Sequence, residues 1–253
     1  MLGQGETEGV FQLESSGMKQ VLAGLQPQNL EDVIALISLY RPGPMDSIPT
    51  YLRNRHEPDK ISYKTPQLAH ILDVTNGCIV YQEQVMQIFR ELAGFSFGQA
   101  DNVRRAMSKK KHAVMEAERE HFVHGCTEPG HECPGCVANG ISEKVANEIY
   151  DEMSSFASYA FNKSHAACYA YVAFQTAYLK CHYPSEFMAA LLTSVLDNTD
   201  KVIEYSGECA RLGIKVLPPD INVSNGGFTA DANGQIRFGL NAVKSVGRNL
   251  VER

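Results

Sequence analysis

The sequence predicts a mainly helical protein with a small β-containing segment toward its C-terminus. Apolar residues recur at helical spacing over most of residues 1–213, and proline or glycine separates these stretches. After Gly213 the pattern changes, because short β-favouring runs alternate with turn residues, and Asn233-Gly234 is typical of a hairpin. We therefore expect two parts, a helical domain over residues 1–213 and a β-containing segment over residues 214–253.

Caps and breakers place the helices of the first half. Asn29 is expected to cap a helix with two acids in its first turn, and the prolines of residues 41–44 end that helix. Residues 51–65 are polar and are expected to form a loop, whereas residues 78–81 are expected to form a short strand or a buried turn. The other helices of this half are predicted at residues 82–93, 99–107 and 112–123.

The second half begins with a turn-rich stretch, residues 125–140, which is expected to be a loop inserted between helices. Pro184 is expected to open a helix over residues 185–196. Three further helices are expected to start at polar caps, namely Ser142, Ser164 and Thr199. The short strands are predicted at residues 216–217, 228–229 and 236–238.

Composition narrows the class of protein. The chain has 253 residues, with 23 Lys and Arg against 29 Asp and Glu. The net charge of −6 argues against a purely electrostatic DNA-binding protein but leaves room for a local basic patch. The longest apolar stretch, within residues 166–179, is too short to span a bilayer, so no membrane partner is expected. The seven cysteines are mostly scattered and no secretory signal is present, which predicts a reduced, cytoplasmic protein with unpaired thiols.

The densest local charge lies in residues 104–111, where five of eight residues are basic and none is acidic. Residues four apart on a helix share a face, so the arginines and lysines would form a basic stripe while Val103 and Met107 face the core. Such a stripe can bind the phosphates of a nucleic acid or of a nucleoside triphosphate. The alternative interpretation is a solvated helix face.

A second polar cluster, Phe161-Asn162-Lys163-Ser164-His165, lies at a predicted helix start. Free backbone N–H groups and the positive end of the helix dipole attract anions there. The lysine adds a full charge, and the serine and histidine add hydrogen-bond donors. An ordinary N-cap beside a surface lysine is the alternative. Tyr81-Gln82-Glu83-Gln84 at the head of a helix and Arg41 before Pro-Gly-Pro are weaker signals of ligand contact.

One short segment has the residue types of a zinc site. Cys126, His131, Cys133 and Cys136 offer thiolates and an imidazole, which suit Zn²⁺. All four lie within 11 residues, whereas structural zinc sites commonly draw their ligand pairs from separated segments. A surface loop with free thiols is the alternative.

Catalytic motifs are scarce. The sequence contains no Walker loop and no His-Glu-Xaa-Xaa-His. It also contains no Asp-Xaa-Asp pair of the kind that two-metal phosphoryl transfer uses to hold its ions. No catalytic residue is therefore predicted in this chain.

Five motifs, in order along the chain, resemble one family. They are Gly9-Val-Phe-Gln-Leu-Glu-Ser15, Leu39-Tyr-Arg-Pro-Gly-Pro44, Tyr81-Gln-Glu-Gln-Val-Met86, Arg104-Arg-Ala-Met107 with Lys109-Lys-Lys111, and Phe161-Asn-Lys-Ser-His165. Together they resemble the C-family of bacterial replicative DNA polymerases, the alpha subunits of DNA polymerase III, over essentially the whole chain. The resemblance implies the multi-helix fingers domain of such a polymerase, with Val246-Gly247-Arg248 at the approach to its helix-hairpin-helix region.

The resemblance also implies roles for individual residues, because the fingers close over the template and the incoming deoxynucleoside triphosphate (dNTP). The candidate nucleotide-binding residues are Arg104, Arg105, Asn162, Lys163, Ser164 and His165. The candidate DNA-binding residues are Arg41, Lys109, Lys110 and Lys111. The implied partners are primer-template DNA, dNTP, the rest of the alpha subunit and the replicase holoenzyme. The implied Mg²⁺ is held by palm-domain aspartates that no stretch here matches, so the chain alone is expected to be inactive. The cysteine-rich loop is not a shared motif, so the resemblance gives the zinc prediction no support.

Three functions thus remain open from the sequence. The leading one is a nucleotide- and DNA-binding fingers domain. The alternatives are a non-enzymatic nucleic-acid-binding module stabilised by zinc and a helical protein-interaction adaptor. The metal content of the purified chain and the salt dependence of DNA binding would separate them.

Overall fold

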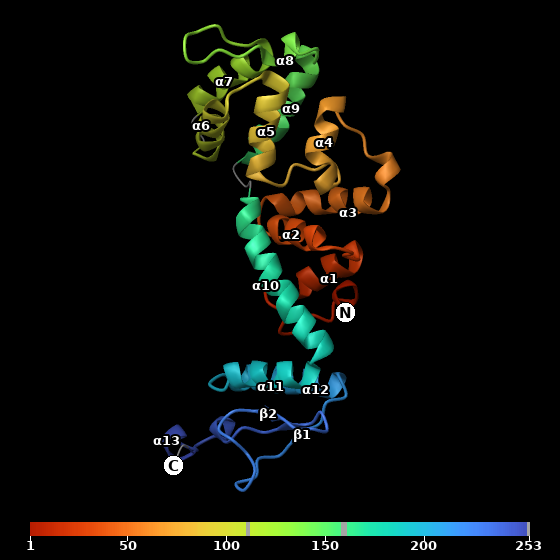
Figure 1. The fold of residues 1–253 in the computed structure, drawn as a ribbon, viewed down its shortest axis with the longest axis vertical. Helices are drawn as coiled ribbons and strands as arrows, with labels where there is room; N and C mark the ends of the chain where they lie inside the picture. The colour runs from red at the N-terminus through yellow and green to blue at the C-terminus, as the bar shows by residue number, and fades with distance from the viewer. Residues whose placement is uncertain (110–111, 158–160, 252–253) are drawn as a thin grey trace. The chain divides into compact units, whose positions relative to one another are not determined.

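The computed structural model describes residues 1–109, 112–157 and 161–251. The described chain is mainly helical with a small three-stranded sheet after residue 213, as the sequence predicts. It forms two compact units (Figure 1): a central unit of residues 27–170, and a terminal unit of residues 1–26 and 171–253. None of the described helices is both long and apolar enough to cross a membrane. The domain boundary near residue 213 stays a prediction.

The central unit is built from helices. In chain order they are α2 (Leu30–Leu39), α3 (Ile48–His56), α4 (Ala69–Leu72), α5 (Gln82–Ala93), α6 (Phe97–Ser108), α7 (His112–His124), α8 (Gly135–Ala138), α9 (Glu143–Ala157) and the first part of α10 (Lys163–His182). Short 3₁₀ turns, among them Pro44–Ser47, Pro58–Lys60 and Pro66–Leu68, lie between the earlier helices. The helices predicted at residues 82–93, 99–107 and 112–123 are confirmed as α5, α6 and α7.

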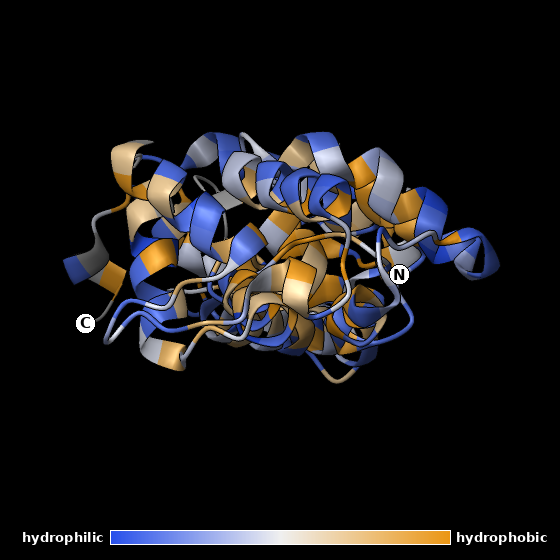
Figure 2. Ribbon diagram, turned by 90° about the horizontal axis from the view of Figure 1, so that it is seen from above, coloured by the Kyte–Doolittle hydropathy of each residue, from blue (hydrophilic) through white to orange (hydrophobic). Residues whose placement is uncertain are grey.

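Helices α5, α7 and α9 pack around an apolar core. Val85, Ile88 and Phe89 of α5 are completely buried at helical spacing. The Phe89 ring packs edge-on against Phe122 of α7 and Tyr150 of α9, with centroids 5.0 and 6.0 Å apart. Apolar residues (orange) alternate with polar residues (blue) along the helices (Figure 2), as expected for helices with one buried face. This packing fixes which face of α5 is left for a ligand.

The loop predicted over residues 51–65 is wrong in its first part, because α3 extends through residue 56. Pro49 lies in the first turn of α3, where its missing N–H leaves no intrahelical bond unmade. Arg53, Arg55 and His56 lie in the last turn, where positive charge interacts favourably with the helix dipole. The polar composition that suggested a loop therefore belongs to a helix with a narrow buried face.

The terminal unit combines helices with the small sheet. It contains α1 (Ser16–Leu25), the later part of α10, α11 (Pro184–Ser194), α12 (Thr199–Arg211), α13 (Arg248–Val251), β1 (Val216–Leu217), β2 (Thr229–Ala230) and β3 (Ile236–Arg237). Strand β3 lies in the middle, parallel to β1 and antiparallel to β2. The hairpin predicted at Asn233-Gly234 is confirmed, since these residues join β2 to β3. The core of this unit includes three completely buried residues: Leu192 of α11, Cys209 of α12 and Ile236 of β3.

Helix caps follow the sequence in part. Asn29 caps α2 as predicted, because its Oδ1 accepts the N–H three residues later at 3.0 Å. The predictions that Ser164 caps α10 and Thr199 caps α12 are wrong. Asn162 and Asn198 do so instead, and their Oδ1 atoms accept backbone N–H groups at 2.9 and 3.1 Å. Asparagine caps a helix as well as serine does, so a helix can begin at the earlier of two neighbouring polar residues.

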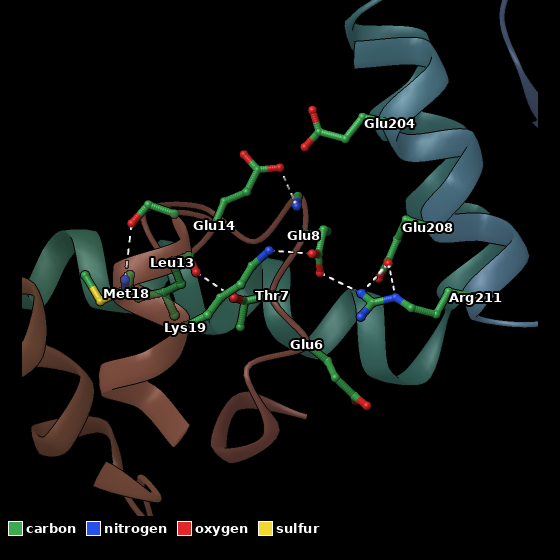
Figure 3. A network of polar contacts seen from close by, with 12 residues as sticks. Glu6, Thr7, Glu8, Leu13, Glu14, Met18, Lys19, Glu204, Glu208 and Arg211 are labelled. Carbon is green, nitrogen blue, oxygen red and sulfur yellow. Dashed lines mark hydrogen bonds and ion pairs between the residues drawn. The ribbon is translucent and has the colours of Figure 1, made fainter. Parts of the chain in front are cut away.

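A chain of ion pairs ties the N-terminal residues of the terminal unit to α12 (Figure 3). Lys19 of α1 pairs with Glu8, Glu8 pairs with Arg211 at 2.7 Å, and Arg211 also pairs with Glu208. The side chains of Glu8 and Arg211 are 20% and 54% exposed, so this part of the chain of pairs reaches solvent.

The interior end of the same network is a buried ion pair. The Lys180 ammonium of α10 lies 2.6 Å from a Glu208 oxygen, and it donates to the carbonyl oxygens of Glu6 and Glu8 at 3.2 and 2.9 Å. The Lys180 and Glu208 side chains are only 1% and 2% exposed. All three protons of the ammonium therefore have acceptors, which is the condition for burying a charge.

Candidate functional site

A cleft of about 470 Å³ in the central unit brings together residues that are far apart in the sequence. Its walls include Gln82, Glu83 and Arg90 of α5, Asp101 and Arg104 of α6, and Asn162 immediately before α10. Two predicted nucleotide-binding residues, Arg104 and Asn162, thus line one cleft although they belong to separate sequence clusters.

Arg104 reaches the cleft because its neighbours on α6 anchor the opposite face. Val103 and Ala106 are buried, as predicted for Val103, so Arg104 is turned outward. Its Nη1 donates to Gln82 Oε1 at 2.8 Å, and its Nε and Nη2 donate to Asp101 Oδ1 at 3.0 and 2.7 Å. The guanidinium is therefore held in place between α5 and α6.

Asp101 holds both predicted arginines. Its second oxygen accepts a hydrogen bond from Arg105 Nε at 2.7 Å. The hydrogen bond from Arg104, followed by that from Arg105, holds the pKa of the Asp101 carboxyl below its usual value. The Arg105 side chain is 65% exposed and does not line the cleft. The structure thus separates the two arginines, which the sequence places together, into one cleft residue and one surface residue.

The start of α10 holds an anion already, and that anion is Glu83. The backbone N–H of Lys163 donates to both Glu83 oxygens at 3.2 and 3.1 Å, and Asn162 Nδ2 donates at 2.8 Å. Anions are expected at this place because the first N–H groups of a helix have no partner within the helix. A side chain of the protein therefore occupies the position predicted for a phosphate.

The Lys163 side chain is turned toward α2. Its ammonium lies 3.0 Å from a Glu31 oxygen and 5.3 Å from the centre of the Tyr81 ring. A backbone bridge fixes this part of the unit, because Gln82 N–H donates to Phe161 O at 2.9 Å. Lys163 thus lies beside the cleft but is not among its lining residues.

The remaining predicted residues surround the start of α10. The His165 ring lies between those of Phe161 and Tyr169, with centroids 5.3 and 4.5 Å away. Arg41 stacks over the Phe161 ring at 4.1 Å, and burial lowers the pKa of its guanidinium. Ser164 is exposed at the first turn of α10. Lys109 is exposed at the end of α6, whereas Lys110 and Lys111 lie outside the described residues.

Arg90 is a cation of the cleft that sequence reasoning missed. It lies on the same face of α5 as Met86 and Gln82, at spacings of four and eight residues, and its guanidinium lies 5.8 Å from the centre of the Phe97 ring. This spacing was visible in the sequence. A single arginine on a helix is common, however, and only the position of α6 makes it part of a cleft.

The predicted zinc site is not formed. Cys126 and Cys133 face each other in a backbone bridge with two hydrogen bonds of 2.9 Å, and the Cys133 thiol donates to the carbonyl of His121. Cys136 is completely buried in the apolar core, where burial raises the pKa of its thiol to about 12. His131 is exposed. The four residues thus point to three different environments.

The Pro134-Gly135 turn between Cys133 and Cys136 has a role in backbone packing. Gly135 has a φ of +78°, and a Cβ atom there would lie 2.3 Å from the backbone nitrogen of Gly125. The turn therefore permits close backbone packing. Across the described residues, no three His, Cys, Asp or Glu side chains gather to hold a metal ion.

The fold and the cleft define a helical module with arginine and amide donors on one open surface. Residues 1–130 match the family model for the bacterial DNA polymerase III alpha subunit finger domain, and residues 213–253 match a helix-hairpin-helix motif. The chain therefore belongs to the family of bacterial DNA polymerase III alpha subunits.

Individual relatives agree with this assignment. The DNA polymerase III subunit alpha of Thermus aquaticus is 51% identical over 98% of the chain, and that of Bacillus subtilis (strain 168) is 47% identical over the whole chain. That of Pasteurella multocida is 46% identical over the whole chain. The chain spans about a fifth of the length of these relatives, 20% to 22%.

Proposed function

We propose that the chain is the fingers part of a bacterial replicative DNA polymerase, which binds the incoming dNTP and primer-template DNA during template-directed synthesis. The observation that carries this proposal is the cleft that joins Arg104 to Asn162 at the start of α10. In this proposal the chain acts in the bacterial cytoplasm, together with the rest of an alpha subunit and the replicase holoenzyme.

The triphosphate binds by exchange of partners. Arg104 and the N–H groups at the start of α10 now contact Asp101 and Glu83, two carboxylates of the protein. These contacts are partly exposed, and such ion pairs contribute only about 0–1 kcal/mol each. A triphosphate offers more charge and can form bidentate bonds to a guanidinium. It therefore takes over donors that are already oriented.

DNA binding has a separate basis. Positive charge for a DNA backbone comes from four residues within the sequence of the central unit, Arg41, Lys109, Lys110 and Lys111. The helix-hairpin-helix match over residues 213–253 supports contact with DNA by the terminal unit. The chain alone does not extend a primer, because its sequence has no Asp-Xaa-Asp pair to hold the Mg²⁺ ions that activate a 3′-hydroxyl.

A titration with a fluorescent dNTP tests the proposal. Arg104→Ala should weaken binding about tenfold, since a charge-assisted hydrogen bond contributes roughly 1.5–3 kcal/mol. The matched control is Lys144→Ala, which removes an 85% exposed cation from α9 outside the cleft and should change the dissociation constant less than about twofold. Equal affinities for wild type and Arg104→Ala would contradict the proposal.

A further inference from the structure

The central unit has a second cleft, of about 350 Å³, that shares no lining residue with the first. Three cations line it from three segments: Arg53 from α3, Lys60 from the 3₁₀ turn Pro58–Lys60, and Lys64 from the loop before Pro66. One carboxylate, Glu152 of α9, completes its charged lining. The cations therefore surround the cleft and do not follow one helix face.

The three cations differ in how firmly they are held. Lys64 is fixed, because its ammonium lies 2.6 Å from Glu152 and donates to the carbonyl of Glu148. Lys60 pairs only with Glu57, and its side chain is 74% exposed. The exposed Arg53 guanidinium makes no hydrogen bond or ion pair within the described part of the chain. Arg53 and Lys60 are thus available to a ligand, and Lys64 neutralises the single acid.

Backbone packing shapes one wall of this cleft. Gly77 has a φ of +79°, and a Cβ atom there would lie 2.8 Å from Ile61 Cγ2. Asn54 Nδ2 donates to the carbonyl of Asn76 at 2.7 Å, which ties α3 to the same wall. Leu68 and Leu72 supply an apolar part of the lining. The wall is therefore preformed.

The charges of the two clefts point to different ligands. The first cleft has two cations, Arg90 and Arg104, against three carboxylates, and its donors are already paired. The second has three cations against one carboxylate, in a chain whose net charge is −6. An excess of cations over carboxylates is the pattern that attracts a polyanion.

We propose that this second cleft binds the phosphate groups of a DNA backbone, with Arg53 and Lys60 as the contacting cations. The identity of the polyanion as DNA rests on the proposed function. A compact anion needs donors that converge on one point, whereas these cations enter from separate segments beside apolar surface that suits a sugar. In the sequence these residues are spaced 7 and 4 apart and interleaved with acids, which hides the cluster.

The test uses fluorescence anisotropy of a labelled duplex, measured over a range of salt concentrations. The double variant Arg53→Ala, Lys60→Ala should bind DNA more weakly. In a plot of the logarithm of the binding constant against the logarithm of the salt concentration, its slope should be less steep by about 2, since each phosphate contact contributes about 0.9. The control, Lys144→Ala with Lys201→Ala, removes the same charge from two lysines outside the cleft, the first exposed and the second partly buried, and should keep the wild-type slope. Urea unfolding of both variants confirms that they fold.

The outcomes separate this proposal from the nucleotide proposal. A less steep salt dependence of DNA binding in the double variant, with unchanged dNTP affinity, supports a DNA site apart from the first cleft. A wild-type slope in the double variant, or no DNA binding by wild type at low salt, overturns the second cleft and leaves the dNTP result standing. Displacement of DNA by micromolar pyrophosphate, but not by sulfate of equal ionic strength, would assign the cleft to a free polyphosphate and overturn the DNA assignment.

Discussion

One ion pair of the terminal unit and the ion pairs at the first cleft of the central unit hold their charges in opposite ways. In the terminal unit, Lys180 and Glu208 are 1% and 2% exposed, and every proton of the ammonium has an acceptor. In the central unit, the Arg104 and Asp101 side chains are each 21% exposed, and Lys163 is 34% exposed beside its carboxylate partner. The same kind of ion pair is therefore sealed from solvent at Lys180–Glu208 and open to solvent at the first cleft.

This difference separates structural charges from charges that can bind ligands. Water cannot replace a lost partner in the buried pair, so removal of one charge leaves the other without compensation. At the open pairs, water or a phosphate can take the place of the carboxylate at little cost. Burial, more than the identity of the residues, decides which role an ion pair has.

The largest expected effect is on stability, from Glu208→Gln. The substitution leaves the Lys180 charge buried without its counter-ion and should lower the free energy of unfolding by about 3 kcal/mol, measured by urea denaturation. The control is Glu204→Gln on the same helix, whose pair with Lys201 is 46% exposed on the acid side, and which should cost less than about 1 kcal/mol. Equal losses in the two variants would show that burial does not govern these pairs.

A smaller effect, on dNTP affinity, is expected from Glu83→Gln at the solvent-exposed start of α10. Removal of the carboxylate from the start of α10 removes an internal competitor for phosphate. The affinity for dNTP should rise about threefold, since an exposed pair is worth roughly 0.6 kcal/mol. Glu120→Gln on α7, where the Glu120 side chain is 72% exposed, serves as the control. A weaker affinity in Glu83→Gln would mean that the carboxylate orients the donors and does not compete for them.

The smallest expected effect is that of metal removal. EDTA should leave the melting temperature unchanged within about 1 °C, because the predicted zinc ligands do not gather into a group of three among the described residues. A calorimetric scan before and after chelation measures this. A large fall in melting temperature would restore the zinc site.

Thiol alkylation at pH 8 gives a further check on the same cysteines. Cys168 and Cys181 are exposed on α10 and should react with iodoacetamide within minutes in the folded protein. Cys136 and Cys209 should stay unmodified until the chain unfolds, because burial raises the pKa values of their thiols to about 12 and about 11. Mass spectrometry of the digested protein would show the pattern, and rapid labelling of Cys136 would contradict its place in the core.

The sequence predicted the helices whose bounds are set by the spacing of nearby apolar residues and by helix-breaking residues. The period of apolar residues and the stop at Gly94 located α5 to the residue. A polar stretch hid α3, because few of its residues are buried, Ile48 and Tyr51 among them. Local pattern also could not place Glu83 on the start of α10, since that contact joins residues 80 positions apart.

The candidate sites show the same limit. Arg104 and Asn162 were selected one cluster at a time, and only the packing of α5, α6 and α10 reveals that they share a cleft. Cys136 has the spacing of a zinc ligand, yet its position depends on the burial of α8 against α5 and α7, which spacing does not encode. Sequence therefore identifies chemical types, and tertiary packing decides which of them meet.

The most direct test of the account crosses two variants with two measurements. Glu208→Gln and Arg104→Ala are each assayed for the free energy of unfolding and for the dissociation constant of dNTP, at low temperature and without denaturant for binding. The account predicts that Glu208→Gln loses about 3 kcal/mol of stability and keeps its affinity, whereas Arg104→Ala keeps its stability within about 1 kcal/mol and loses about tenfold in affinity. If both variants lost stability and affinity together, the division between buried structural charges and open ligand-binding charges would be contradicted.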